Sequence, residues 1–383
     1  MKYYLIAGEP SGDALGFKLM QALKALDKKA EFVGVGGDAM QSAGLKSLFN
    51  ISDLAIMGLA EVIPSIPRVL RRINETIEDI KAQKPDAVIS IDSWSFCARI
   101  HKKLRKLNLK ISQIHYVAPQ VWAWKKKRAR TMYKYIDHLL TLFPQEPKYF
   151  TPYKLPATFV GHPVIESDIV NGKKGDFRKR HKIGEDVRLM LVLPGSRHNE
   201  VERLLPTFLQ VVKNIHDKYN DFAFVIPTVS TVAERVKQMV AASGLPVIVV
   251  EGQKERQDAF KEATVAIAAS GTVALELAIV DVPHVVAYKV PKLTEWIARH
   301  FIHIQFVNLS NILLGREIVP ELLQDDCNAE KIEHYVEQFV KHKEIYNRQM
   351  NGFENVRKIL GMGQQTPSRN AAKTIIEVIK NRK

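Results

Sequence analysis

The feature that most constrains the fold is a repeating order of segments, in which a short apolar run is followed by a turn and then by an amphipathic stretch. In the first half of the chain the apolar runs cover residues 3–7, 31–35, 87–91, 111–117, 138–143 and 158–160. The amphipathic stretches between them cover residues 14–26, 69–82 and 96–107. Strands that alternate with helices are usually joined by right-handed crossovers and lie parallel, so the pattern predicts a doubly wound α/β sheet.

The same order begins again after residues 168–188, which are charged, contain glycine and are interpreted as a linker. The second set of apolar runs covers residues 189–193, 223–227, 247–250, 265–269 and 282–288, and helices are predicted over residues 200–218, 232–242, 272–280 and 293–300. The sequence therefore predicts two tandem Rossmann-like domains over residues 1–168 and 186–345, followed by helices over residues 346–383 that return toward the first domain. Open α/β sheets bind ligands outside the carboxyl ends of their strands, so we expect a substrate cleft between the domains.

The charge balance favours anionic partners, because 56 Lys and Arg stand against 41 Asp and Glu and give a net charge of +15. An excess of that size suits nucleic acid, an acidic membrane surface or phosphorylated substrates. Two distant cysteines, Cys97 and Cys327, match neither a disulfide framework nor a zinc motif, which favours a reducing cytoplasm. No secretory signal and no run of about 18 apolar residues is evident, so no membrane-spanning helix is expected.

Polar residues follow the strands of the first domain. The turn at residues 8–13 opens a helix whose free N–H groups favour an anionic or hydroxyl-rich ligand, but it lacks the GxGxxG pattern of dinucleotide sites. Asp92 follows the apolar run at 87–91 and is either a general base or a helix N-cap. The aromatic segment 117–124 and the basic run 125–130 suit stacked bases and phosphates, a sugar platform, or a solvated helix face.

Two strand ends of the second domain carry residues that suit a nucleotide diphosphate. One strand ends in Pro194, Gly195, Ser196 and Arg197, and another ends in Ser270, Gly271 and Thr272. A guanidinium and a helix N-terminus both bind phosphate oxygens, while Glu276 can reach a ribose hydroxyl. Each turn alone is common as a helix cap, and their pairing favours a binding site. No Walker A sequence and no Asp-x-Asp pair is present, so no metal and no cofactor is expected, and the leaving-group charge falls to Arg197, helix termini and Lys289.

Residues 56–67 form an apolar segment that is followed by a cluster of arginines. Pro64 and Pro67 make a regular buried helix difficult before Arg68. An apolar segment beside cations suits a membrane surface, where the cations meet lipid phosphates, and it equally suits a lid that packs on its own core.

Several segments, in the same order along nearly the whole chain, resemble the lipid-A-disaccharide synthase family. They are AGEPSGD at residues 7–13, MG at 57–58, YVAPQVWAW at 116–124, GHP at 161–163, LPGSR at 193–197, ASGT at 269–272 and NIL at 311–313. The resemblance implies the GT-B fold and an inverting, metal-independent transferase. Such an enzyme joins UDP-2,3-diacylglucosamine to 2,3-diacylglucosamine 1-phosphate and releases the β-1,6-linked disaccharide 1-phosphate and UDP. It also implies a cytoplasmic protein, peripheral on the anionic inner face of a Gram-negative inner membrane, with no nucleic-acid partner; a homodimer is compatible with it.

The resemblance implies a role for each turn. Asp92 matches the catalytic base, Glu9 a second catalytic position, and Ser11 a position at the reacting sugars. Positions that match the UDP side are Arg197, Ser270, Gly271, Thr272, Glu276, Tyr288, Lys289 and Asn311. Positions that match membrane or acyl contacts are Met57, Leu59, Val62, Ile63, Ile66, Val69 and Leu70.

Two segments depart from the family pattern. Trp94-Ser95-Phe96-Cys97 stands where many members have Pro-Asp-Phe-Asn, and Ser310 stands where proline is usual. Any role of that second acidic residue or of the asparagine is therefore absent here. The alternatives are another GT-B enzyme on UDP-GlcNAc, such as a lipid-linked GlcNAc transferase or a 2-epimerase, a basic nucleic-acid-binding protein, and a membrane scaffold without catalysis.

Overall fold

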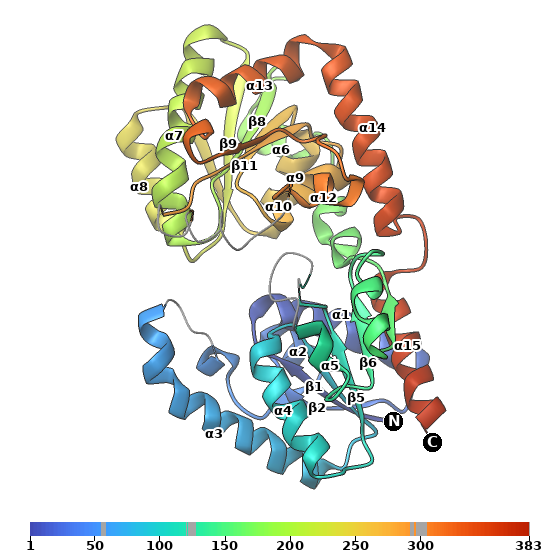
Figure 1. Cartoon of the computed structure of the whole chain (residues 1–383). Helices are drawn as coiled ribbons and strands as arrows, with labels where there is room; N and C mark the ends of the chain where they lie inside the picture. The colour runs from blue at the N-terminus through green and yellow to red at the C-terminus, as the bar shows by residue number, and fades with distance from the viewer. Residues whose placement is uncertain (55–58, 120, 122–127, 292–294, 296–304, 383) are drawn as a thin grey trace. The chain divides into compact units, whose positions relative to one another are not determined.

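The computed structural model describes residues 1–54, 59–119, 121, 128–291, 295 and 305–382 (Figure 1). The chain divides into two compact units. The first comprises Met1–Pro163 together with Gly363–Lys383, and the second comprises Val164–Met362.

The first unit is built on a seven-stranded sheet in the order β3-β2-β1-β4-β5-β6-β7, and every neighbouring pair is parallel. Its strands are β1 Lys2–Ala7, β2 Glu31–Val35, β3 Lys46–Ser47, β4 Ala87–Ile91, β5 Ser112–Tyr116, β6 His138–Thr141 and β7 Ala157–Phe159. Its α-helices are α1 Pro10–Leu26, α2 Asp38–Ser42, α3 Leu59–Gln83, α4 Trp94–Lys106, α5 Ala129–Met132 and α15 Pro367–Arg382. All six predicted strands are confirmed. The sequence did not predict β3, whose two residues are polar and too few to show a periodic pattern.

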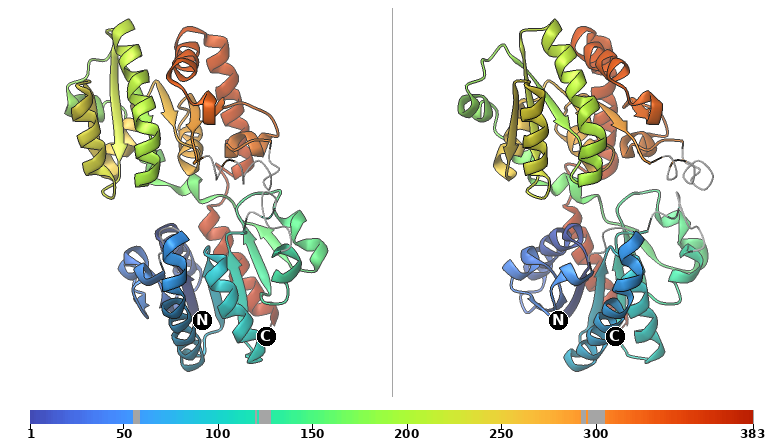
Figure 2. Two further views of the ribbon diagram at one scale, coloured as in Figure 1. Left: turned by 60° about the vertical axis from the view of Figure 1, so that its left-hand side comes forward. Right: turned by 90° about the vertical axis from the view of Figure 1, so that its left-hand side faces the viewer.

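Helices cover both faces of this sheet (Figure 2). Side chains alternate along β1, so Tyr3 and Leu5 pack against α1 and α15, whereas Tyr4 and Ile6 pack against α3 and α4. A parallel sheet that is buried on both faces needs near-continuous apolar strands, which explains why the apolar runs were readable in the sequence.

Helix α3 begins earlier than predicted. It begins at Leu59 rather than near residue 69 and continues through Pro64 and Pro67. Each proline removes one helical hydrogen bond, yet the backbone is helical across both positions. Residues 66–68 are exposed, so this part of α3 is not the regular buried helix that the two prolines disfavour.

The second unit is built on a six-stranded parallel sheet in the order β10-β9-β8-β11-β12-β13. Its strands are β8 Arg188–Leu193, β9 Phe222–Thr228, β10 Val247–Glu251, β11 Val265–Ala268, β12 His284–Tyr288 and β13 Glu321–Leu323. Its α-helices are α6 Asp176–His181, α7 His198–Lys218, α8 Ala233–Ser243, α9 Gln253–Glu262, α10 Thr272–Ile279, α12 Leu309–Leu314, α13 Ala329–Lys341 and α14 Lys343–Leu360. Helices α7, α8 and α13 cover one face, and α6, α9 and α10 cover the other. Almost all of the helix predicted over residues 293–300 lies outside the described residues.

The segment 168–188 is part of the second unit rather than a linker. Arg178 and Glu262 form a nearly buried ion pair at 2.7 Å, and the backbone N–H of Lys173 donates to Asp258 Oδ1 at 2.9 Å. The linker prediction was wrong because charged and backbone groups of this segment bind α9 and the segment belongs to the second unit.

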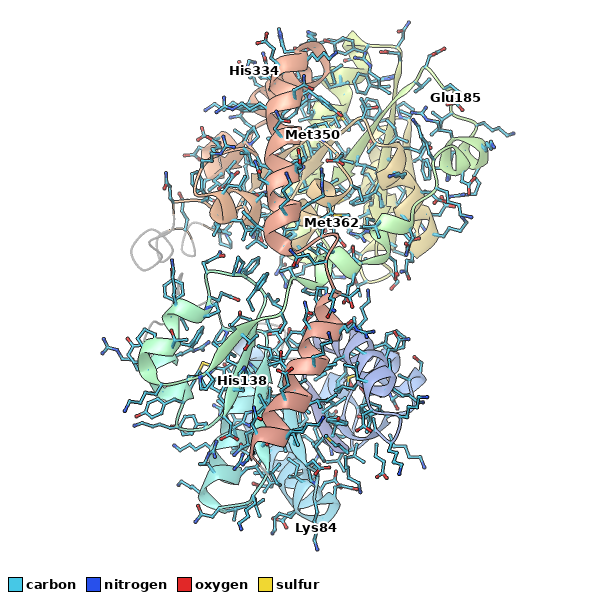
Figure 3. All side chains as sticks on the ribbon, turned by 90° about the vertical axis from the view of Figure 1, so that its right-hand side faces the viewer. Lys84, His138, Glu185, His334, Met350 and Met362 are labelled. Carbon is cyan, nitrogen blue, oxygen red and sulfur yellow. The ribbon has the colours of Figure 1, made fainter. Side chains whose placement is uncertain are left out.

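The last helices are divided between the units at Met362 and Gly363. Figure 3 shows α14 along the second unit, with Met350 on the helix and Met362 just past its end. Gln349 of α14 donates to His284 O at 3.0 Å, whereas Asn370 of α15 donates to Val160 O of the first unit at 3.1 Å.

Candidate active site

Each sheet has one point at which the strand order reverses, between β1 and β4 in the first unit and between β8 and β11 in the second. The connections leave such a point in opposite directions, and the space at the carboxyl ends of the two strands is the usual ligand site of a doubly wound sheet. We call residues 8–13 and 92–95 the first reversal site, and residues 194–200 and 269–276 the second reversal site.

The backbone is strained around the first reversal site. Asp92, Ser93 and Val117 have φ angles of 55°, 42° and 81°, in the left-handed region that is disfavoured for side chains and most of all for a β-branched one. The sheet holds these angles, because Asp92 N donates to Tyr116 O at 2.9 Å and Val117 N donates to Leu140 O at 3.1 Å. Strain of this kind is concentrated at functional sites in proteins, which directs attention to the side chain of Asp92.

A pocket of about 520 Å³ opens at this site within the first unit. Its lining residues are Gly8, Glu9, Leu54, Val69, Asp92, Ser93, Trp94, Ser95, Phe96, Arg99, Val117, Pro119 and Arg128. Charged groups among apolar walls in a volume of this size are typical of a small-molecule site. The structure thus brings Glu9 and Asp92 to one pocket. Ser93 Oγ, from the residue after Asp92, donates to Glu9 Oε1 at 2.8 Å, and a Cβ on Gly8 would lie only 3.0 Å from Ser93 Oγ.

Asp92 is half-buried, and its Oδ1 accepts a hydrogen bond from Ser93 N at 2.8 Å. Burial raises the pKa of Asp92, the Ser93 N–H group opposes that effect, and the negative charge of Glu9 raises the pKa further. A carboxylate with a raised pKa accepts a proton more readily, as a general base must.

Buried polar side chains connect β4, β5 and α4 behind the pocket. His101 Nδ1 lies 2.9 Å from Gln113 Oε1, and Ser90 Oγ lies 2.7 Å from both His101 Nε2 and His115 Nδ1. The Gln113 amide oxygen can only accept, so His101 carries its proton on Nδ1 and its Nε2 accepts from the Ser90 hydroxyl. The Ser90 oxygen in turn accepts from His115 Nδ1. Burial lowers the pKa of His101 to about 4 and also lowers that of His115, so both rings are neutral. The Trp94 ring lines the pocket, and its centroid lies 4.6 Å from that of His115.

Two other polar residues of the turn at 8–13, Asp13 and Ser11, do not line this pocket. Asp13 is buried and accepts from the N–H groups of Gly37, Ala39 and Met40 at 2.8, 2.9 and 3.0 Å, so it caps α2. Ser11 is exposed in the first turn of α1 and is not among the described residues that line the pocket.

At the second reversal site, the carboxylate of Glu200 occupies the turn after β8. Its Oε2 accepts from Ser196 N at 3.2 Å and Arg197 N at 3.3 Å, and its Oε1 accepts from Arg197 Nη1 at 3.2 Å and Tyr288 OH at 3.1 Å. Gly195 has a φ of 108°, and a Cβ there would clash with Glu200. The N–H groups that were predicted to face a ligand therefore already bind an anionic group, while the Arg197 side chain is 80% exposed.

The turn after β11 is more open. Gly271 has a φ of 123°, and no heavy atom of the described residues would lie within 4 Å of a Cβ there. Ser270 is half-buried and Thr272 is exposed at the N-terminus of α10. Glu276, one turn further, is ion-paired with Arg256 of α9.

Tyr288 and Lys289 lie at the end of β12, next to the Glu200 cluster. Burial raises the pKa of Tyr288, and the charge of Glu200 adds to this effect. Lys289 is half-buried, and its carbonyl accepts from Arg203 Nη1 at 3.2 Å.

The structure gives Asn311 a structural role in place of the predicted UDP contact. Its side chain is fully buried, and Nδ2 donates to Val319 O and Glu321 Oε1, both at 2.8 Å, while Oδ1 accepts from two backbone N–H groups at 2.8 and 3.0 Å. An amide that makes four internal hydrogen bonds has none left for a nucleotide. The neighbouring Ser310 N–H donates to Asn308 Oδ1 at 2.7 Å, a bond that a proline would remove.

The predicted membrane contacts lie on α3 as far as the structure describes them. Ile66 and Leu70 are each 46% exposed and, four residues apart, share one face of the helix, while Val69 lines the pocket. Predicted positions whose side chains the structure does not describe are Met57, Leu59, Val62 and Ile63. None of the helices in the described ranges is long and apolar enough to cross a membrane.

Pocket residues that sequence reasoning did not assign to the site include Trp94, Arg99 and Val117. The position of Arg99 could have been inferred from the sequence. It lies three residues after Phe96 in the helix predicted to follow Asp92, so the two side chains share one face of that helix, and both line the pocket. The position of Val117 could not have been inferred, since its positive φ depends on the sheet around it. Trp122 and Trp124 lie outside the described residues.

Two parallel sheets with Rossmann strand order, each with a candidate ligand site at its reversal, define a protein of the GT-B fold. A UDP-GlcNAc 2-epimerase from Neisseria meningitidis, solved with UDP-GlcNAc bound, matches with a TM-score of 0.61 and 14% identity over 100% of both chains. An α,α-trehalose 6-phosphate synthase from Burkholderia multivorans matches with a TM-score of 0.60 and 12% identity over 99% of this chain and 97% of that one. These likenesses confirm the predicted fold.

A family model described as lipid-A-disaccharide synthetase matches residues 3–375. The lipid-A-disaccharide synthase of Rhodospirillum centenum is 46% identical over 99% of this chain and 95% of its own, and that of Paramagnetospirillum magneticum is 45% identical over 100% and 99%. The chain therefore belongs to the lipid-A-disaccharide synthase family. It is a glycosyltransferase that forms a disaccharide from a UDP-sugar and an acceptor.

Proposed function

We propose that this chain transfers 2,3-diacylglucosamine from its UDP derivative to the 6-hydroxyl of 2,3-diacylglucosamine 1-phosphate. The observation that carries the proposal is the pocket of the first reversal site, in which the half-buried Asp92 lies among apolar walls and beside Glu9. A sugar hydroxyl needs a base, and acyl chains need apolar contacts, so this combination suits an acylated acceptor.

In the proposed reaction the oxygen of the acceptor hydroxyl bonds to the anomeric carbon of the donor while Asp92 takes the proton from that hydroxyl. The bond from that carbon to the diphosphate oxygen breaks on the opposite face, which inverts the carbon, and the electron pair leaves with UDP. Arg197, Ser270 and Thr272 would bind the diphosphate at the second reversal site, where helix N-termini also favour negative charge. Gly271 would let the phosphates approach the backbone, and Glu276 belongs to the same site. Tyr288, whose OH donates to Glu200 Oε1 at 3.1 Å, and the adjacent Lys289 follow at the end of β12.

The proposal includes a location on the cytoplasmic face of the inner membrane. The exposed Ile66 and Leu70 of α3 lie on either side of the exposed Arg68 in sequence, and apolar side chains beside a cation suit an anionic lipid surface. Sedimentation with anionic vesicles, which should decrease when Ile66 and Leu70 are changed to Ser, tests this part.

The transfer itself is tested by incubating the purified protein with the two diacylated substrates and following the products by mass spectrometry. We expect UDP and a disaccharide phosphate in equal amounts. Epimerisation of UDP-GlcNAc without any disaccharide would indicate the 2-epimerase alternative instead.

A further inference from the structure

Two arginines in the pocket of the first unit have no role in the proposed transfer. Arg99 of α4 and Arg128, which directly precedes α5, line the same pocket as Asp92 and Glu9. We infer that these two guanidiniums bind the phosphate of the acceptor and so select a phosphorylated sugar; this inference rests on the proposed function.

The two pocket arginines differ from Arg72 and Arg105 of the first unit in their contacts. Arg72 and Arg105 are held in ion pairs with aspartates. Within the described ranges, by contrast, no carboxylate lies at ion-pair distance from Arg99 or Arg128. Arg99 Nη1 donates to Ser95 O at 2.8 Å, which leaves the other N–H groups of this guanidinium for a ligand.

The carboxylates of the pocket have other partners. Glu9 accepts from Ser93 Oγ, and Asp92 accepts from Ser93 N. A phosphate monoester would be repelled by these two negative charges unless cations compensated them. Guanidinium groups match phosphate oxygens well, because their planar N–H groups can form two parallel hydrogen bonds with them.

Ser95 explains why Arg99 is unpaired. It is exposed, lines the pocket and stands four residues before Arg99 on α4, the spacing at which an acidic side chain would form an ion pair. A serine at this position leaves the positive charge directed at the pocket, and Ser95→Asp should neutralise it without disturbing a buried group.

The test compares two acceptors, 2,3-diacylglucosamine 1-phosphate and the same lipid without its phosphate, with UDP-2,3-diacylglucosamine as the donor. The measured quantity is the ratio of kcat/KM for the phosphorylated acceptor to that for the unphosphorylated one. Loss of one charge-assisted contact should lower this ratio about tenfold in Arg99→Ala and in Arg128→Ala, mainly through KM. Ser95→Asp should also lower the ratio of the two kcat/KM values.

Lys102→Ala is the matched control, because Lys102 is an exposed cation on the same helix and does not line the pocket. Its ratio should equal that of the wild type, and UDP affinity measured by calorimetry should be the same in all five proteins. An unchanged ratio in all three pocket variants, or weaker UDP binding in the arginine variants, would overturn the inference. If the wild type makes no disaccharide from either acceptor, the proposed function itself fails, which is a different result from an active enzyme that does not discriminate.

Discussion

In the first unit the turns after β1 and β4 leave a pocket of about 520 Å³, whereas in the second unit the turn after β8 is occupied by the carboxylate of Glu200. Both places arise from the same topology, a reversal of strand order in a parallel sheet. The first contains left-handed residues and unpaired guanidiniums, and the second contains ion pairs made by Arg197 and Arg256.

The difference teaches that equivalent positions in two Rossmann-like sheets can be prepared for different tasks. A general base needs a pKa that is not depressed, and burial and the charge of Glu9 raise the pKa of Asp92 although Arg99 and Arg128 line the same pocket. At the second site the N–H groups of Ser196 and Arg197 already donate to Glu200, so a diphosphate would have to compete with this carboxylate for them. Under the proposed function, the first site would supply the general base and the second would bind the nucleotide.

Asp92→Asn should separate these tasks most clearly. Asparagine keeps the shape but cannot accept the proton, so kcat should fall by about 10² to 10⁴, the usual contribution of a general base. UDP affinity should not change, because the proposed nucleotide contacts lie at the second site. Turnover by mass spectrometry and UDP binding by calorimetry check the two expectations. Near-normal turnover would mean that Asp92 is only a structural residue at the start of α4.

Arg197→Ala should have the opposite effect. Loss of a charge-assisted contact to phosphate should weaken UDP binding by about tenfold to a hundredfold. The KM for the acceptor should stay the same, since Arg197 belongs to the second unit. Arg235→Ala is the control, because Arg235 is an exposed arginine of the same unit that pairs with Glu202. Equal UDP affinity in both variants would remove Arg197 from the phosphate site.

Glu200→Gln tests whether the carboxylate at the second site competes with the nucleotide. The amide keeps one acceptor for the turn but removes a negative charge from the groups that the diphosphate needs. We expect UDP to bind about two- to fivefold more tightly, in line with the value of an exposed ion pair. Glu202→Gln on the same helix provides the matched control. Weaker binding would show instead that Glu200 is needed to hold Arg197 and Tyr288 in place.

The fold and the turns were largely predictable from the sequence, because buried parallel strands are near-continuous apolar runs and the turns follow them directly. Asp92 could be found in this way, since its position at a strand end depends only on chain order. The contacts that fill a turn could not. Glu200 was interpreted as the start of a helix, and nothing in the sequence shows that its carboxylate returns to the backbone of Ser196.

Asn311 and the segment 168–188 show the same limit. The family resemblance implies a UDP contact for Asn311, and the charged, glycine-containing composition of 168–188 indicates a linker. Their roles depend on partners distant in sequence or set by the local fold, such as Glu262 for Arg178 and Val319 for Asn311. Such pairing is a property of tertiary packing, and a single sequence does not contain a local signal for it.

Glu9→Gln should produce the smallest effect and should sharpen the account of the first site. Burial and then the charge of Glu9 raise the pKa of Asp92. Glutamine can still accept from Ser93 Oγ but removes the negative charge, so ionised Asp92 becomes more favourable and its pKa falls. Since the base acts when ionised, the acid limb of the kcat/KM profile should move to lower pH. Glu78→Gln, an exposed site on α3 that pairs with Lys81, should leave the limb in place. A shift to higher pH, or none, would mean that Glu9 does not act on Asp92 through its charge and that burial alone sets the proton affinity of the base.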